Sequence, residues 1–532
     1  MTNTVNKIIT RSSLAIAIGM VSSLATAMQA MSDSELSNAR GQALLSLGHT
    51  APSAAGTGAN YKDYSYYKMG LEAKVELNAN IRSLQLGCGG VNGAGGCDID
   101  IQNLSLSGPA DGKLASGEPT WSKGRANTSA VLTNPFLEFA IKNAGSAATR
   151  EVVGFRLSAE EILGHMAAGT VNDNINGLSS GGGINSLSGY IGVAPTPVNS
   201  FTSPAMFGTT EDQIIYSDVT TAVGDRVAAT NPQAMTPGRP GYVAPNSDAD
   251  LRGVDGLYRT NPSDPYSVIW GVHVPSQPVA FTFPQTSVTG KRMTQLNLTV
   301  RDVPIPTIAI GARSGGVSMT MDQALAGVNA ATFFMGAKGT TSAGCAATYN
   351  ATNCTYIKNL KANVQVKQNF NLVHNLPLSS GGYLSLQKEA LRWPGSTSAF
   401  TYDLTSGAIV NRADDYVAPA NEIFNAGDIA QPGWWMSFRD PLDFGALNPT
   451  TGIPMDDVLP QIATFVTNYL SNNDVDLSIG DALGAVFGAP LYKGIGDITL
   501  SNDARAVMSL QNLPLDGHQN PVANCWGGLK FC

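Results

Sequence analysis

The chain has 532 residues, enough for two to four domains or for one long β body with a large core. Only 14% of its residues are charged and 57 are glycines, a composition that favours turns and exposed sheets over helical bundles. The formal net charge of −8 argues against a phosphate-binding surface, so we do not expect a nucleic-acid partner.

Residues 1–30 have the pattern of a secretory signal peptide. Lys7 and Arg11 precede an apolar run from Leu14 to Leu24, and small residues follow this run. The run is too short and wrongly flanked for a transmembrane helix. We therefore expect the chain to be exported, with cleavage after Ala27 or Ala30.

Six cysteines fall into three close pairs, which favours local disulfide bonds in an exported chain. The gaps within the first two pairs have the same length and are rich in Gly, Ala, Asn and Thr. A metal site is the alternative, but the sequence has no Cys-x-x-Cys motif, and no histidine lies near the cysteines to complete a set of ligands. The expected bonds join Cys88 to Cys97, Cys345 to Cys354, and Cys525 to Cys532.

The clearest strand pattern runs from Leu71 to Arg82, where apolar and polar residues alternate without a break. This alternation predicts one long strand with one wet face. A similar stretch begins at Leu360, and the openings LEAKVELNANI and LKANVQVKQNF match in pattern and partly in identity. Either a duplicated β unit or a coincidence between two ordinary strands explains the match.

Both stretches are candidate assembly strands. Long strands with open edges are templates for pairing between chains, either by strand addition or by packing of their faces. A shorter repetition supports a recurring hairpin, because SGGVSMTMDQAL and SGGYLSLQKEAL each launch an alternating segment from a Ser-Gly-Gly turn. The candidate assembly residues are Leu71, Val75, Leu77, Ile81, Leu360, Val364, Val366 and Phe370.

The expected fold is mainly β, with long antiparallel strands and hairpins in a sandwich or a curved sheet, with or without duplication. A few short helices accompany it, including helices that start at Ser32 and Ser158, where the capping-box spacing occurs, and more helix near 455–490. The expected segments are a signal peptide at 1–30, an N-terminal segment with a short helix at 31–60, a first β block at 61–193, a Pro-rich loop or insertion at 194–265, a second β block at 266–440 and a helix-containing C-terminal region at 441–532.

The segment that begins at Met31, with the sequence MSDSELSNARGQA, resembles the start of the mature region in a family of exported Gram-negative surface proteins. The family motif is L-x-D-x-x-L-S-x-x-x-G-Q, and here Met31 stands at its first position and Arg40 precedes the Gly. Members are associated with Fil-type pilus systems, and FLEFAIKN, REVVGFRLSAEEILGHMAAG and INSLSGYIG are similar to phrases in the larger ones. The resemblance implies a role at the cell surface or in a filament and carries no catalytic residues.

Catalytic motifs occur only in fragments, so we do not expect an enzyme. Gly177 to Gly181 match G-x-S-x-G around Ser179, yet no strand-turn-helix pattern surrounds them. Ser385 and Lys388 match S-x-x-K on an alternating strand. The five histidines are scattered, and the pair Trp434 and Trp435 is more typical of a core or an interface than of a ligand site.

No cofactor is expected, with calcium as the one candidate ion. Alternating acidic residues supply the oxygen ligands that Ca²⁺ prefers, although neither run completes an EF-hand loop, and solvated turns are the alternative. The candidate calcium ligands are Asp248, Asp250, Asp474 and Asp476.

These patterns together predict a structural subunit or surface-exposed component of an extracellular bacterial appendage, a pilus or filament, that contributes to adhesion. We expect self-association or contacts with other appendage subunits, and location at the outer membrane or cell surface after export across the inner membrane. The alternatives are an outer-membrane β-barrel or surface receptor, which alternating strands also suit, and a secreted hydrolase that uses Ser179.

Overall fold

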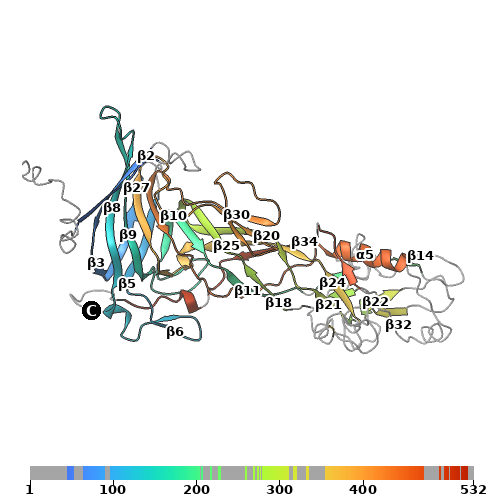
Figure 1. The fold of residues 1–532 in the computed structure, drawn as a ribbon. Helices are drawn as coiled ribbons and strands as arrows, with labels where there is room; N and C mark the ends of the chain where they lie inside the picture. Colours follow the sequence, from blue (N-terminus) through green and yellow to red (C-terminus); the bar gives the residue numbers. More distant parts are fainter. Residues whose placement is uncertain are drawn as a thin grey trace, which may run out of the picture.

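A computed structural model of the chain describes residues 45–52, 64–89, 96–203, 278–310, 354–472, 497–502, 504–515 and 517–524. It also describes short pieces at 205–207, 216–218, 226–228, 258–259, 268–269, 272–274, 276, 316–319, 331–334, 345 and 491–492. Strands account for most of these residues and helices for few, so the expected mainly β fold is confirmed. The molecule is elongated, with a large curved sheet at one end and narrow ribbons of short strands at the other (Figure 1).

The large sheet contains twelve strands within the described residues, in the order β1-β2-β8-β9-β27-β31-β10-β5-β4, with β3 beside β8, β26 beside β9 and β19 beside β10. Because β5 also pairs with β9, the strands β9, β27, β31, β10 and β5 close a ring. The strands are β1 (Leu45–Thr50), β2 (Tyr64–Leu71), β3 (Lys74–Leu77), β4 (Ala79–Leu86), β5 (Ile99–Ser107), β8 (Ala130–Lys142), β9 (Glu151–Ala167), β10 (Ile184–Val193), β19 (Thr286–Met293), β26 (Asn375–Leu378), β27 (Gly382–Gln387) and β31 (Gly433–Phe438).

Three ribbons of three strands follow one another away from the large sheet. In each ribbon one pair of strands is antiparallel and the other is parallel. They consist of β20 (Gln295–Pro304), β25 (Lys361–Asn369) and β34 (Arg505–Gln511), then β21 (Ile308–Ile310), β24 (Thr355–Lys358) and β33 (Asp497–Thr499), then β22 (Gly316–Met319), β23 (Ala331–Phe334) and β32 (Leu491–Tyr492).

Two-stranded ribbons and two small sheets complete the described strands. The ribbons pair β11 (Thr196–Phe201) with β18 (Pro278–Phe283), β12 (Ala205–Phe207) with β17 (Val272–Val274), β13 (Tyr216–Asp218) with β14 (Arg226–Ala228), and β15 (Tyr258–Arg259) with β16 (Val268–Ile269). The small sheets are β6 (Gly112–Lys113) with β7 (Pro119–Thr120), and β28 (Phe400–Asp403) with β29 (Ile409–Asn411) and β30 (Glu422–Asn425). One apolar core is continuous from the large sheet into the ribbons, and it includes Leu187, Val198, Val364 and Ile462.

The hairpin of β4 and β5 is formed by segments that are neighbours along the chain. Its strands pair antiparallel from Ala79 with Leu106 to Leu86 with Ile99. A disulfide between Cys88 and Cys97 closes the loop that joins them. The second expected disulfide, between Cys345 and Cys354, is also present, and Cys525 and Cys532 lie outside the described residues.

The first alternating stretch is not the single long strand that we expected. It is divided among β2, β3 and β4, with breaks at Glu72–Ala73 and at Asn78. The physical reason is a change of partner, because β2 and β3 pair with β8 whereas β4 pairs with β5. The second stretch forms β25 and then turns into a short 3₁₀ helix, η5 (Phe370–Leu372), so its last residues are not in the strand.

Helices are few among the described residues. The α-helix α5 (Leu459–Asn472) lies in the region where more helix was expected, and the 3₁₀ helices are η2 (Arg125–Asn127), η5 and η6 (Gly517–Gln519). The helix expected to start at Ser158 is wrong, because β9 runs through this residue and pairs with β8 on one side and β27 on the other. Pairing on both edges outweighs a local capping pattern. The helix expected to start at Ser32 lies outside the described residues.

Candidate functional site

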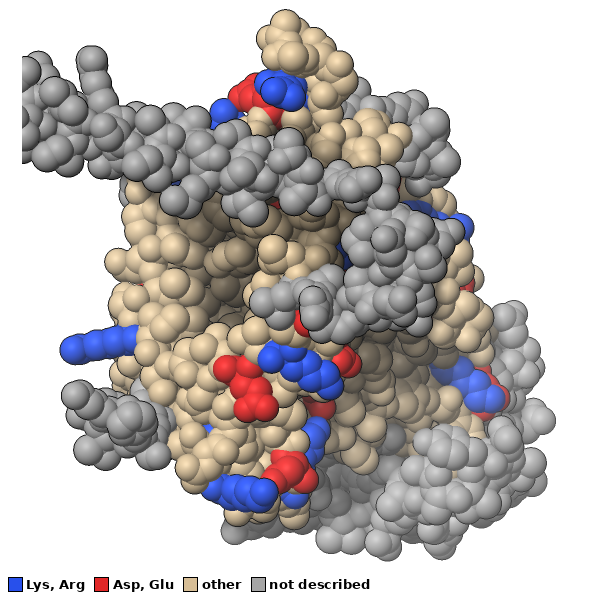
Figure 2. All heavy atoms as spheres, turned by 60° about the vertical axis from the view of Figure 1, so that its left-hand side comes forward, with Lys and Arg blue, Asp and Glu red and all other residues tan. Residues whose placement is uncertain are grey.

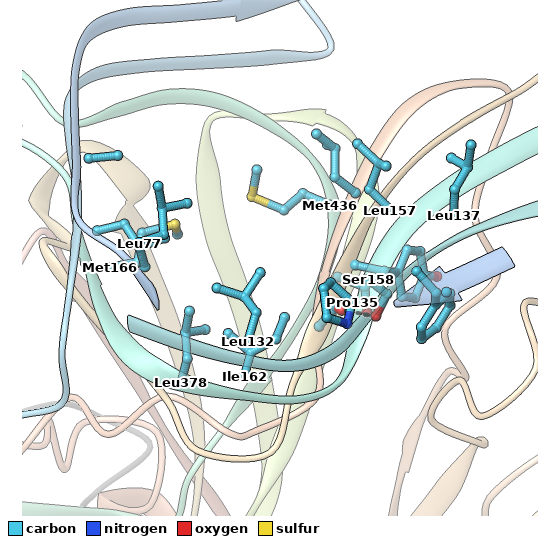
Figure 3. A pocket seen from close by; sticks show the side chains of 18 of the residues that line it. Leu77, Leu132, Pro135, Leu137, Leu157, Ser158, Ile162, Met166, Leu378 and Met436 are labelled. Carbon is cyan, nitrogen blue, oxygen red and sulfur yellow. Dashed lines mark hydrogen bonds between the residues drawn. The ribbon is translucent and has the colours of Figure 1, made fainter. Parts of the chain in front are cut away.

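The large sheet encloses a hollow of about 620 Å³ on one of its faces. We call it the apolar hollow, and its walls come from β1 to β5, β8, β9, β26, β27 and β31. Figure 2 shows it as a recess lined by uncharged residues, with Lys, Arg, Asp and Glu gathered below it in that view. Characteristic lining residues, labelled in Figure 3, are Leu77, Leu132, Leu157, Ile162, Met166 and Met436.

Register in the sheet aligns apolar side chains into rows that cross this face. Residues directly opposite on neighbouring antiparallel strands point to the same face of a sheet. Two such rows cross β1, β2, β8, β9, β27 and β31 in this order. They are Leu47, Met69, Leu137, Leu157, Leu384 and Met436, and His49, Tyr67, Phe139, Phe155, Leu386 and Trp434.

The opposite face of the same strands is the buried one. It carries Glu138, Arg156, Ser385 and Trp435, all of which are buried. The apolar face is the more open one, since Leu47 is 80% exposed and Leu157 is 47% exposed. The sheet therefore departs from the usual half-exposed pattern, because its open face is apolar as well as its buried face, where Tyr66, Trp393 and Trp435 pack.

A buried polar cluster holds the opposite face together. Asp428 accepts hydrogen bonds from Tyr383 Oη at 2.8 Å, Trp435 Nε1 at 3.0 Å and Ser437 Oγ at 2.5 Å. Burial raises the pKa of the Asp428 carboxyl, and burial together with this carboxyl raises the pKa of Tyr383 well above its usual range. Donors from β27 and β31 thus converge on one carboxyl group, which fixes these two strands beneath the apolar hollow.

The few polar groups in the lining are already used within the protein. Ser158 Oγ donates to the carbonyl oxygen of Gly382 at 2.6 Å. The hydroxyls of Tyr383 and Ser437 both donate to Asp428. The lining, as far as the structure describes it, contains no charged side chain. The apolar hollow therefore presents almost only hydrocarbon to whatever enters it.

Strand β1 forms one rim of the hollow and is an edge strand of the described sheet. Among the described residues it pairs with β2 alone. Leu45, which lines the hollow, is 62% exposed, and β1 contains no charged residue. Edge strands of soluble proteins are commonly protected by charges or by proline, and β1 has neither.

The candidate assembly residues separate into two different environments. Leu71, Leu77 and Ile81 line the apolar hollow, and Val75 is exposed on β3 outside the lining. The other four, Leu360, Val364, Val366 and Phe370, are buried in the core. Because β25 is paired with β20 on one edge and β34 on the other, it has no open edge for a further strand.

The residues of the fragmentary catalytic motifs have structural contacts. Ser179 Oγ donates to the carbonyl oxygen of Val171 at 2.6 Å, and its backbone N–H donates to Asn371 Oδ1. Ser385 is buried within β27, whereas Lys388 Nζ reaches Glu151 at the surface. Of the tryptophan pair, Trp435 is fully buried and Trp434 packs edge-on against Phe155.

The candidate calcium ligands Asp248, Asp250, Asp474 and Asp476 lie outside the described residues. Within the described ranges, no three His, Cys, Asp or Glu side chains are grouped where they could hold a metal ion. The same ranges contain no helix with the length and apolar character that crossing a bilayer requires.

The fold and site define a mainly β protein with a disulfide-closed hairpin and an open apolar hollow. Comparisons with protein-family models, curated proteins and solved structures find no match.

Proposed function

We propose that this protein is a structural subunit or surface-exposed component of an extracellular bacterial appendage, a pilus or filament, that it assembles through contacts between subunits, and that it contributes to adhesion. The observation that carries the proposal is the uncharged outer edge of β1, which pairs with no other described strand and lies beside an exposed apolar face. Exposed apolar patches of this kind are typical of surfaces that contact another molecule. The signal-peptide pattern and the resemblance of residues 31–43 to exported surface proteins point to the same role.

Strand addition at β1 is the expected contact. A strand from a second subunit would pair with the backbone groups on the outer edge of β1 and extend the described sheet by one strand. Its apolar side chains would cover Leu47, which stands at the end of the row that leads across the sheet to Met436. A lysine in place of Leu47 is the type of change that natural edge strands use against such pairing.

The test compares surface fibres from four strains, which carry the wild-type gene, no gene, Leu47→Lys or Val417→Lys. Val417 is a suitable control because it is 88% exposed and belongs to none of the strands. Electron microscopy of sheared material is expected to show one class of fibre in the wild type and the Val417→Lys strain and to show its loss in the other two. Unchanged fibres in the strain without the gene would overturn the proposal.

A further inference from the structure

We propose that the apolar hollow binds the hydrocarbon chain of a free fatty acid. This inference goes beyond the proposed appendage role, because it concerns the interior of the hollow and not the edge of β1. It rests on the chemistry of the lining, on the volume of the hollow and on the opening of the hollow to water.

The lining selects hydrocarbon. A polar group that enters the hollow would lose its contacts with water and find no replacement, because Ser158, Tyr383 and Ser437 already donate to protein acceptors. A peptide segment is disfavoured for the same reason. The central strands of the walls, such as β8, β9 and β27, are paired on both edges, so a peptide could form a backbone ladder only at an edge strand such as β1 and not inside the hollow.

The size and the side chains suit a single flexible chain. A volume of about 620 Å³ lies in the middle of the range of roughly 300–1,000 Å³ that is typical of small-molecule pockets. Met69, Met166 and Met436 contribute to the lining, and unbranched methionine side chains adapt to occupants of irregular shape. Figure 3 shows side chains from several strands directed at the same space.

The polar end of the ligand would remain in water at the open side. The described lining offers no Lys or Arg to bind a phosphate, so the lining gives a phospholipid headgroup no ionic contact. A carboxylate needs no partner in the protein if it stays at the mouth and only its chain is buried. A charged group that stays at the mouth needs no partner in either case, so the volume decides, and a hollow that suits one flexible chain is assigned to a free single-chain acid and not to a two-chain lipid.

Binding is measured with the purified mature chain by displacement of an environment-sensitive apolar fluorophore. The competitors are octanoate, dodecanoate and hexadecanoate, together with vesicles of phosphatidylcholine and phosphatidylglycerol. Each buried methylene adds a similar increment of transfer free energy, so affinity is expected to rise by roughly tenfold for every two methylenes that fit in the hollow. Displacement by vesicles alone, or by none of these acids, would overturn the proposal.

Two substitutions on β9 provide a matched pair. Leu157→Asp places a carboxylate in the hollow, whereas Val152→Asp makes the same change outside the lining. Leu157 is 47% exposed and Val152 is 51% exposed, so neither change buries a charge in the free protein and both variants are expected to fold. Leu157→Asp should weaken hexadecanoate binding by at least about tenfold. The variant loses an apolar contact with the bound chain and places a charge beside it.

The control Val152→Asp should bind hexadecanoate as the wild type does. Equal binding by the two β9 variants would contradict the assignment of the hollow. A variant with a smaller hollow gives a second measurement. Ala79→Phe narrows the hollow, so the increase of affinity with chain length should stop at a shorter acid than in the wild type. Leu47→Lys, which tests assembly, should leave hexadecanoate binding unchanged, so that failure of the appendage proposal and failure of this one are distinguishable.

Discussion

Arg156 donates from Nε to Glu138 Oε2 at 2.6 Å, in an ion pair whose side chains are only 7% and 4% exposed. The two residues lie directly opposite each other on β9 and β8. The guanidinium of Arg156 also donates to the carbonyl oxygen of Pro394 and lies over the rings of Tyr383 and Trp393. This pair therefore joins the large sheet to the segment that covers its buried face.

Glu138→Gln is expected to destabilise the protein strongly. The change leaves the buried guanidinium of Arg156 without its counter-charge, which typically costs about 3–5 kcal/mol. Urea unfolding measures the loss. The matched control is Glu160→Gln, because Glu160 forms an exposed pair with Lys68 at 2.9 Å that should contribute less than about 1 kcal/mol. Similar losses in the two variants would contradict a special role for the buried pair.

Sequence predicts those parts of this fold that depend on neighbours along the chain. Alternation followed by a Gly-rich loop between Cys88 and Cys97 is sufficient to predict the hairpin of β4 and β5 and its disulfide. The break at Asn78 could not be predicted in this way. It arises because the chain leaves β8, a strand that lies far along the sequence, and takes β5 as its next partner.

The same alternation has opposite outcomes in the two stretches. Leu77 is 42% exposed in the wall of the hollow, whereas Val364 is completely buried in the core. Alternation shows that one face of a strand is apolar, but it does not show what covers that face. The hollow was missed because its lining is collected from strands between Leu45 and Phe438, and most of these strands contribute only one to three residues. Only the register of the sheet brings residues such as Leu137 and Leu157 side by side.

Proline substitutions should distinguish the two alternating stretches. Val364 lies between Val300 on β20 and Met508 on β34, so Val364→Pro disrupts a ladder with partners on both sides and removes a buried side chain. We expect no cooperatively folded protein. Among the described strands Val75 has a partner on one side only, at Leu132, and proline is tolerated better at an edge.

Val75→Pro should therefore remain folded with a lower midpoint of thermal unfolding. Circular dichroism of both variants during heating measures the difference. A folded Val364→Pro variant with an unchanged midpoint would show that β25 is misassigned as a central strand of its ribbon.

The two described disulfides allow a comparison at equal loop length, since both join residues nine apart. Loss of the loop constraint should cost about 2–3 kcal/mol in each case. Cys88→Ala with Cys97→Ala is expected to lose about this amount. Cys345→Ala with Cys354→Ala should lose more, because both of these cysteines are buried and their removal leaves a cavity. Urea unfolding of the two double variants checks the order, and a reversed order would refute the argument from burial.

Stability should fall in mild acid because of His165. Burial lowers the pKa of this histidine to about 4, with a further decrease from the neighbouring charge of Arg125, despite the hydrogen bond to Asn375 Oδ1 at 3.0 Å. The folded protein therefore keeps the ring neutral, whereas the unfolded chain takes up a proton below the ordinary pKa of 6.5. The contribution to stability is complete above pH 6.5 and is lost as the pH falls towards 4.

The shift corresponds to a loss of up to about 3 kcal/mol across this window. Urea unfolding at a series of pH values between 7 and 4 measures it, and the difference between the wild type and His165→Gln isolates the contribution of this ring. Some pH dependence should remain in the variant, because burial also lowers the pKa of His374. A variant whose stability changes with pH as steeply as that of the wild type would show that His165 is not the group that is kept neutral.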